Sequence, residues 1–179
     1  MTYKVVYEFV ITGEEPLMVN NPEKQIQPRT GKGTNKTGMN KVIPVEDKLY
    51  VNKEGKYIIP SLCLKASIKS ASRDLKIGRK NCMNFTKKGL YIEPAELVIS
   101  PQKWIKDGRT VVINRKDRIF TERPVFPEWS LKGKIRIEDE VLTEEIVKQL
   151  LNDAGAYKGL GTFRDEFGKF RVDLFKKLD

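Results

Sequence analysis

Apolar and polar residues alternate with a period of two over residues 3–11 and 128–139, the pattern of a β-strand with one buried face. The apolar segments 89–100 and 168–175 are predicted as two further core strands. Pro94 marks a bulge or an edge position in the first of these segments. The hydrophobic pattern therefore predicts four core strands.

Two segments show the spacing of an amphipathic helix. The first begins at Ser61, a residue type suited to an N-cap, and is predicted to end near Gly78. Its apolar positions are Leu64, Ile68, Ala71 and Leu75. The second helix is predicted from the N-cap Thr143 to Gly155, which suits the residue that follows a helix.

Long insertions at about 13–57 and 101–127 separate these elements. Residues 47–60 are predicted as a hairpin that turns at 53–55, and residues 109–126 as one or two strands outside the main sheet. Without the insertions the order is β, α, β, β, α, β. The sequence therefore predicts one α+β domain over 1–179, a ferredoxin-like (RRM-like) antiparallel sheet with two helices on one face and long inserted loops and hairpins.

Composition narrows the function of this domain. The 179 residues carry a net charge of +10 and no histidine, which favours an anionic partner, although a lysine-rich surface without a role also fits. Two cysteines form no disulfide framework and no zinc site. The sequence contains no membrane-spanning run and no signal-peptide pattern, so it predicts a cytoplasmic protein without membrane contact, metal or other cofactor.

A glycine-rich stretch, "AGAYKGLGTFRDEFGKFRVDLF" (154–175), precedes and includes the last strand. Glycines let backbone N–H groups approach an anion closely, and the aromatic side chains among them provide stacking surfaces. The residues predicted to hold a nucleic-acid backbone here are Lys158, Gly159, Gly161 and Arg164. A tight helix-to-strand connection, with Phe163, Phe167 and Phe170 packed inward, explains the same pattern.

Charge is unevenly distributed along the chain. Residues 65–88 contain eight Lys or Arg and one Asp, a net charge of +7, whereas residues 138–153 have a net charge of −5. Lys65, Lys69 and Arg73 lie on one stripe of the first helix and are predicted to contact phosphates. The alternative is that this stripe is only the solvated face of an amphipathic helix.

The segment 109–126 and the loop 20–41 are also basic. Arg109, Arg115, Arg118 and Arg123 surround an apolar strand and are predicted to wrap or wedge a nucleic-acid strand. Charge that protects an edge strand from aggregation accounts for the same residues. The loop 20–41 is predicted either to become ordered on a ligand or a neighbouring subunit, or to have no role.

Candidate catalytic residues are few. Histidine is absent, and no serine lies in a nucleophile elbow motif. Asp165 and Glu166 are adjacent carboxylates in the glycine-rich stretch, which is weak support for a metal site. The sequence therefore predicts a protein without catalytic residues, and a metal-dependent nuclease is the minor alternative.

Two stretches resemble the repeat-associated (RAMP) superfamily of CRISPR proteins: "IIPSLCLKASIKSA" (58–71) and "GLGTFRDEFGKFRV" (159–172). Ile59, Pro60, Leu64 and Lys65 match the opening of the family's first helix, although Ser61 replaces its glycine. Gly159, Gly161, Arg164, Gly168 and Phe170 match the family's glycine-rich loop. The resemblance implies a ferredoxin-like RNA binder of the effector backbone type, or a stand-alone phage or prophage relative.

The sequence as a whole predicts a non-catalytic protein that binds single-stranded nucleic acid, RNA in preference to DNA. It predicts binding of single-stranded or guide RNA through a basic groove and the glycine-rich loop, with oligomerisation along the strand or assembly with CRISPR-type subunits. Two alternatives stay open: a phage single-stranded DNA-binding or DNA-processing protein, and a CRISPR mimic or inhibitor that docks on a protein partner.

Overall fold

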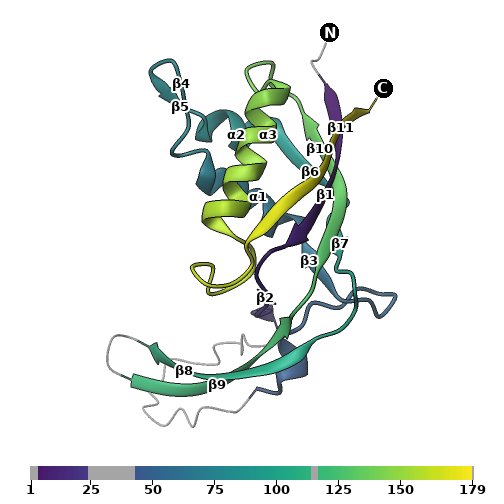
Figure 1. Cartoon of the computed structure of the whole chain (residues 1–179), viewed down its shortest axis with the longest axis vertical. Coiled ribbons are helices and arrows are strands. Elements are labelled where there is room, and N and C mark those ends of the chain that lie inside the picture. Colours follow the sequence, from purple (N-terminus) through teal and green to yellow (C-terminus); the bar gives the residue numbers. More distant parts are fainter. Residues whose placement is uncertain (1–3, 24–42, 114–116, 179) are drawn as a thin grey trace, which may run out of the picture.

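A four-stranded antiparallel sheet forms the centre of an α+β fold (Figure 1). The computed structural model describes residues 4–23, 43–113 and 117–178, with side chains throughout except at 113 and 117–119. The strand order is β11 (Phe170–Leu178), β1 (Val5–Gly13), β10 (Ser130–Ile137) and β6 (Leu90–Glu93). The predicted α+β class and the predicted antiparallel pairing are therefore confirmed.

The alternation of β1 determines which face of this sheet is buried. Tyr7, Phe9 and Ile11 are at most 3% exposed, whereas the residues between them are half-buried. Strand β10 pairs with β1 in antiparallel register and contributes Ile135 and Ile137 to the same core. One period-2 pattern therefore fixes both strand and face, because successive side chains point to opposite sides.

Helices α1 (Ser61–Ala71) and α3 (Glu144–Asp153) cover the core face (Figure 1). Their buried residues include the predicted positions Leu64 and Ile68, together with Leu150. The predicted N-cap was wrong by one residue: Pro60 is the N-cap, and Ser61 is the first helical residue. The first helix is also shorter than predicted, because the chain turns after Ala71 and the Ser72 hydroxyl donates to the Lys69 carbonyl.

A third helix and a small hairpin follow α1 and were not predicted. The hairpin pairs β4 (Lys76–Ile77) with β5 (Lys80–Asn81), and α2 (Met83–Gly89) comes next. Both elements are short, polar and basic, so they have no hydrophobic period that the sequence could reveal. Contacts of Ile77 and Phe85 with the core hold them in place.

The two ends of the predicted strand 89–100 belong to different sheets. The chain changes direction at Pro94, so β6 stays in the main sheet while β7 (Glu96–Val98) pairs with β3 (Ile58–Pro60). The predicted hairpin at 47–60 is reduced to a single bridge between Val51 and Tyr57, because Ile58 and Ile59 pair with β7 instead.

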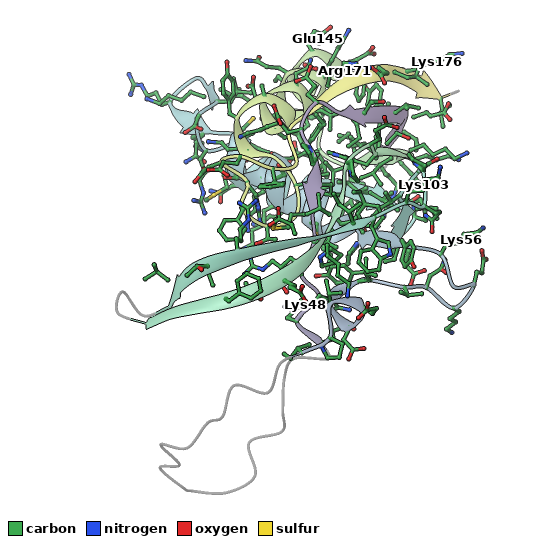
Figure 2. All side chains as sticks on the ribbon, turned by 60° about the horizontal axis from the view of Figure 1, so that its bottom comes forward. Lys48, Lys56, Lys103, Glu145, Arg171 and Lys176 are labelled. Atoms are coloured by element: carbon green, nitrogen blue, oxygen red, sulfur yellow. The ribbon has the colours of Figure 1, made fainter. Side chains whose placement is uncertain are left out.

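A long hairpin, β8 (Ile105–Ile113) and β9 (Asp117–Phe126), extends away from the body (Figures 1 and 2). Strand β2 (Leu17–Met18) pairs with the base of β9. The short 3-10 helix η2 (Val45–Lys48) supports the same base, because the buried Lys48 ammonium donates to the Thr121 hydroxyl and to the Glu122 carbonyl. The predicted excursion from the sheet is therefore a three-stranded sheet of its own.

Candidate nucleic-acid interface

The glycine-rich stretch of residues 159–168, here called the glycine loop, is fastened to the base of the β8–β9 hairpin. The Thr162 N–H donates to the Met18 carbonyl at 2.9 Å, and the Gly168 N–H donates to the Pro16 carbonyl at 2.8 Å. Gly161 has a φ of +75°, and a side chain there would collide with the Met18 carbonyl oxygen. Because β2 also pairs with β9, the loop and the hairpin form one unit, although 39 residues separate Arg123 from Thr162 in sequence.

Two arginines of the hairpin lie on aromatic rings of the glycine loop. The Arg123 guanidinium is 4.6 Å from the centroid of the Phe163 ring. The Arg109 guanidinium is 4.8 Å from the Phe167 ring and 5.6 Å from the Phe163 ring. These are cation–π distances, so the rings fix the positions of both charges.

Phe163 combines exposure with an unusual backbone. Its φ is +53°, and its side chain is 39% exposed. The carbonyl of Phe163 accepts hydrogen bonds from the N–H groups of Glu166 and Phe167, which closes the turn that holds this conformation. A non-glycine residue in the left-handed region costs about 1–3 kcal/mol and persists only where its surroundings enforce it. Of the three phenylalanines considered for inward packing, Phe170 is buried, whereas Phe163 presents its ring to solvent.

The two arginines differ in how far protein carboxylates neutralise them. Arg109 donates twice to Asp107, at 2.6 and 2.9 Å, and lies 3.6 Å from Glu166. In the described part of the chain Arg123 has no carboxylate within ion-pair distance, and its guanidinium donates a hydrogen bond to the Thr162 hydroxyl at 3.4 Å. Burial, and then the charge of Arg109, lowers the pKa of Arg123. Arg123 is therefore a partly buried cation without a carboxylate partner in the described part of the chain.

A pocket of about 600 Å³ opens beside these charges. Its walls come from the hairpin on one side and the glycine loop on the other. The lining residues are Arg109, Thr110, Val111, Val112, Arg123, Thr162, Phe163 and Glu166. The volume lies within the range of small-ligand pockets, about 300–1,000 Å³. We call this site the loop–hairpin pocket.

The structure brings some of the predicted binding residues together here. Arg109 and Arg123 line the loop–hairpin pocket, and Gly161 fastens the glycine loop to Met18 next to it. Gly159 lies on the α1 side of the loop, where its carbonyl accepts a hydrogen bond from Ser67. Arg164 is exposed on the glycine loop, where its Nε donates to the Gly161 carbonyl at 3.2 Å. Arg115, the side chain of Arg118 and the loop from residue 24 to residue 41 lie outside the described residues.

The predicted stripe on α1 lies on a different side of that helix from the glycine loop. Ser67 and Cys63 face the glycine loop. Ser67 Oγ donates to the Gly159 carbonyl at 2.8 Å. Burial raises the pKa of Cys63, and the nearby charge of Arg164 offsets part of that increase. Residues two positions apart on a helix point about 200° apart. Lys65 accordingly lies on the other side, with its ammonium 4.6 Å from the Tyr91 ring centroid.

The remaining predicted cations have separate positions. Lys69 is half-buried on α1, and Arg73 is exposed just beyond its end. Lys158 is bound within the protein, because its ammonium donates to the Asp74 carboxylate at 2.7 Å. The structure therefore separates these three residues from the loop–hairpin pocket.

Asp107, Thr162 and Phe167 are parts of the site that sequence reasoning missed. Asp107 lies in β8 two residues before Arg109, on the same face of the strand. Side chains two positions apart in a strand lie on the same face, so a predicted strand over 105–113 would have placed Asp107 beside Arg109. No sequence signal indicates that Thr162 hydrogen-bonds Arg123, because 39 residues separate them.

We expect Asp107→Asn to change the acid stability of the protein. The hydrogen bond from Arg109, and secondarily its charge, lowers the pKa of Asp107 from its ordinary value of 3.8. A carboxyl group with a depressed folded-state pKa contributes stability that is present above 3.8 and is lost as the pH falls through the folded-state pKa. Urea unfolding between pH 6 and pH 2 should therefore show a stability difference between wild type and Asp107→Asn that shrinks with acidification. A difference that is constant with pH would contradict this prediction.

No helix in the described ranges is long and apolar enough to cross a bilayer. No protein-family model matches the chain, and no curated protein matches its sequence. Among solved structures, the chain is similar to one in the cryo-EM structure of the Type III-B Cmr-beta bound to cognate target RNA, with a TM-score of 0.61 and 13% identity. The match covers 98% of this chain and 61% of the other, so this chain spans about three-fifths of the length of its structural neighbour. At this identity the likeness is one of fold.

Proposed function

We propose that this protein binds single-stranded RNA in the loop–hairpin pocket and catalyses no reaction there. The observation that carries the proposal is the partly buried Arg123 guanidinium, which has no carboxylate partner in the described part of the chain and lies beside the exposed ring of Phe163. A cation in this state favours an external anion, and an exposed aromatic ring favours a stacked base. A nucleotide offers both groups at once.

Each wall of the pocket has a role in this proposal. Arg123 and the Thr162 hydroxyl, 3.4 Å apart, bind one phosphate group, and the open side of Phe163 stacks a base. The Arg109 guanidinium is hydrogen-bonded to Asp107 and lies on the rings of Phe163 and Phe167. Its role is therefore to hold the hairpin against the loop. Glu166 is mostly exposed at the same pocket. Its carboxylate repels phosphate but accepts a hydrogen bond from a ribose 2′-hydroxyl, which favours RNA over DNA.

The architecture supports a RAMP-like assignment. We propose that the core follows the ferredoxin-like βαββαβ plan in one domain over 1–179, with insertions at about 13–57 and 101–127. The strand order β11-β1-β10-β6 supports this plan, with α1 before β6 and α3 before β11. The fold likeness to a chain of an RNA-bound Type III-B complex agrees with it. CRISPR-type subunits or further copies of this chain along one RNA are the protein partners we propose, in the cytoplasm.

The other predicted residues extend the contact surface. We propose that Arg115 and Arg118 contact RNA from the hairpin, and that Lys65 and Lys69 on α1, with Arg73 just beyond its end, contact phosphates. We propose that Lys158, Gly159, Gly161 and Arg164 hold backbone at the glycine loop. Arg164 is free for this role on the exposed side of the loop, whereas Lys158 must first exchange Asp74 for phosphate.

Direct binding tests the proposed function. We expect a labelled single strand of about 30 nucleotides to bind with an affinity that falls steeply with salt, by about 0.7 logarithmic units per logarithmic unit of salt for each phosphate contact. An unlabelled RNA should compete better than DNA of the same sequence. Equal competition by DNA would support a single-stranded DNA-binding protein, and absence of binding to both strands would refute the proposed function. The measurement is fluorescence anisotropy across a salt series.

A further inference from the structure

A second basic surface lies at the end of the molecule opposite the β8–β9 hairpin. The β4–β5 hairpin projects there, with α2 beside it (Figure 1). The exposed cations of this part, here called the β4–β5 surface, are Arg73, Lys76, Arg79, Lys80, Lys87 and Lys88. Five of these six were not among the predicted binding residues, and the loop–hairpin pocket contains none of them.

The β4–β5 surface lacks internal counter-ions. Asp74 is the only acidic residue between Arg73 and Lys88, and its carboxylate is bound to Lys158 at 2.7 Å. None of the six cations forms an ion pair in the described part of the chain. Asp139, an acidic residue, lies against Gly89 at the end of α2. Six positive charges therefore face solvent, and the one carboxylate among them in sequence, Asp74, is paired with Lys158.

The hairpin that carries these charges is anchored. Leu75, Ile77 and Phe85 pack against the hydrophobic core, and Cys82 is fully buried. The Cys82 N–H donates to the Leu75 carbonyl at 2.9 Å, which closes the base of the hairpin. The backbone that carries the cations is thus anchored, so binding an anion orders mainly side chains and costs less than it would on a free loop.

The surroundings of the cations distinguish a polyanion from a protein partner. Protein interfaces have an apolar core, rich in aromatic side chains. No large apolar side chain between residues 73 and 91 is exposed in the structure. A phosphate backbone requires only cations and hydrogen-bond donors, and that is what this surface presents.

We propose that the β4–β5 surface binds a second segment of the phosphate backbone of the strand that occupies the loop–hairpin pocket. This inference rests on the proposed function, and it makes the protein a two-point clamp. The pocket positions one nucleotide through Arg123 and Phe163, whereas the β4–β5 surface adds affinity that depends on charge and not on base identity.

The test compares two triple variants with equal loss of charge. Lys76→Gln, Arg79→Gln and Lys80→Gln together remove the tip charges of the β4–β5 surface. Lys132→Gln, Lys134→Gln and Lys176→Gln remove three exposed charges from the open face of the main sheet. The probe is a labelled RNA of about 30 nucleotides, titrated by anisotropy from low to moderate salt. Thermal unfolding of each variant tests whether it is folded.

We expect the first triple variant to bind more weakly and to lose about two units of salt slope, at about 0.7 per phosphate contact. The ratio of wild-type to variant affinity should therefore fall about 20-fold between 50 and 200 mM salt. The sheet variant should keep the wild-type slope. A wild-type affinity and slope in the first variant would overturn the inference. Equal losses in both variants would also overturn it, because they would show a diffuse effect of net charge.

Arg123→Gln, measured in parallel, separates this inference from the proposed function. If Arg123→Gln loses affinity while the β4–β5 triple variant behaves as wild type, the second contact is refuted and the pocket stands. If the triple variant loses affinity and slope while Arg123→Gln does not, the pocket is refuted, and with it the two-point clamp.

Discussion

Replacing Arg123 with glutamine lowers the affinity for single-stranded RNA by about 10- to 100-fold. Hydrogen bonds to charged groups contribute about 1.5–3 kcal/mol, and each 1.4 kcal/mol is a factor of ten. We expect Arg123 to lie near the top of that range because it is partly buried and has no carboxylate partner in the described part of the chain to compete with phosphate. Glutamine also removes the charge that lies 4.6 Å from the Phe163 ring. Anisotropy at fixed salt measures the loss.

Arg171→Gln is the matched control for Arg123→Gln. It makes the same change in net charge on strand β11, where Arg171 is exposed and paired with Asp173 at 2.9 Å (Figure 2). Arg171→Gln should bind RNA within about twofold of wild type, since exposed ion pairs contribute little. Arg123→Lys should fall between the two, because lysine keeps the charge and loses the planar guanidinium. Similar affinities for Arg123→Gln and Arg171→Gln would refute a specific role for Arg123.

Gly161→Ala destabilises the fold by about 2–5 kcal/mol and weakens RNA binding at the same time. An L-residue at a φ of +75° costs about 1–2 kcal/mol, and overpacking adds about 1–3 kcal/mol. The new methyl group meets the Met18 carbonyl oxygen, which is backbone and has no rotamer with which to move aside. The glycine loop must therefore shift from β2, and Thr162 and Phe163 move with it. Urea unfolding gives the stability loss, and anisotropy gives the loss of affinity.

Gly55→Ala separates the two causes. Gly55 has a φ of +77°, yet a methyl group there meets no atom within 4 Å. Gly55→Ala should therefore lose only the conformational contribution, about 1–2 kcal/mol of stability, and should leave RNA affinity unchanged. A stability loss in Gly161→Ala no larger than that in Gly55→Ala would show that contact with Met18 does not constrain the loop.

The spacing of apolar residues was sufficient to predict elements in which every second residue, or every third or fourth, is buried. The alternation around Phe9 and the helical spacing of Leu64 and Ile68 each report burial on one side, and these residues are buried. The pattern failed where partners came from elsewhere. Residues 89–100 look like one strand, but β6 and β7 pair with different strands, β10 and β3. The small β4–β5 hairpin has no apolar period to detect.

The candidate site divides in the same way. The sequence indicated Arg109, Arg123 and the glycine loop as separate basic or flexible features, because residue type and local charge are visible in one dimension. It did not indicate that Arg109 is neutralised by Asp107 and that Arg123 lacks a carboxylate partner in the described part of the chain. That difference depends on strand register and on burial, which local charge counts do not contain.

The sequence by itself determined the α+β class, the faces of the core strands and helices, and the excess of positive charge. These properties follow from the periods of 2 and 3.6 residues and from composition, so they need no knowledge of distant contacts. Only the tertiary structure decided that the glycine loop joins the β8–β9 hairpin and that the α1 stripe points away from it. Pairing of β2 with β9 and the fit of Gly161 against Met18 bring those segments together, and such contacts depend on residues far apart in the chain.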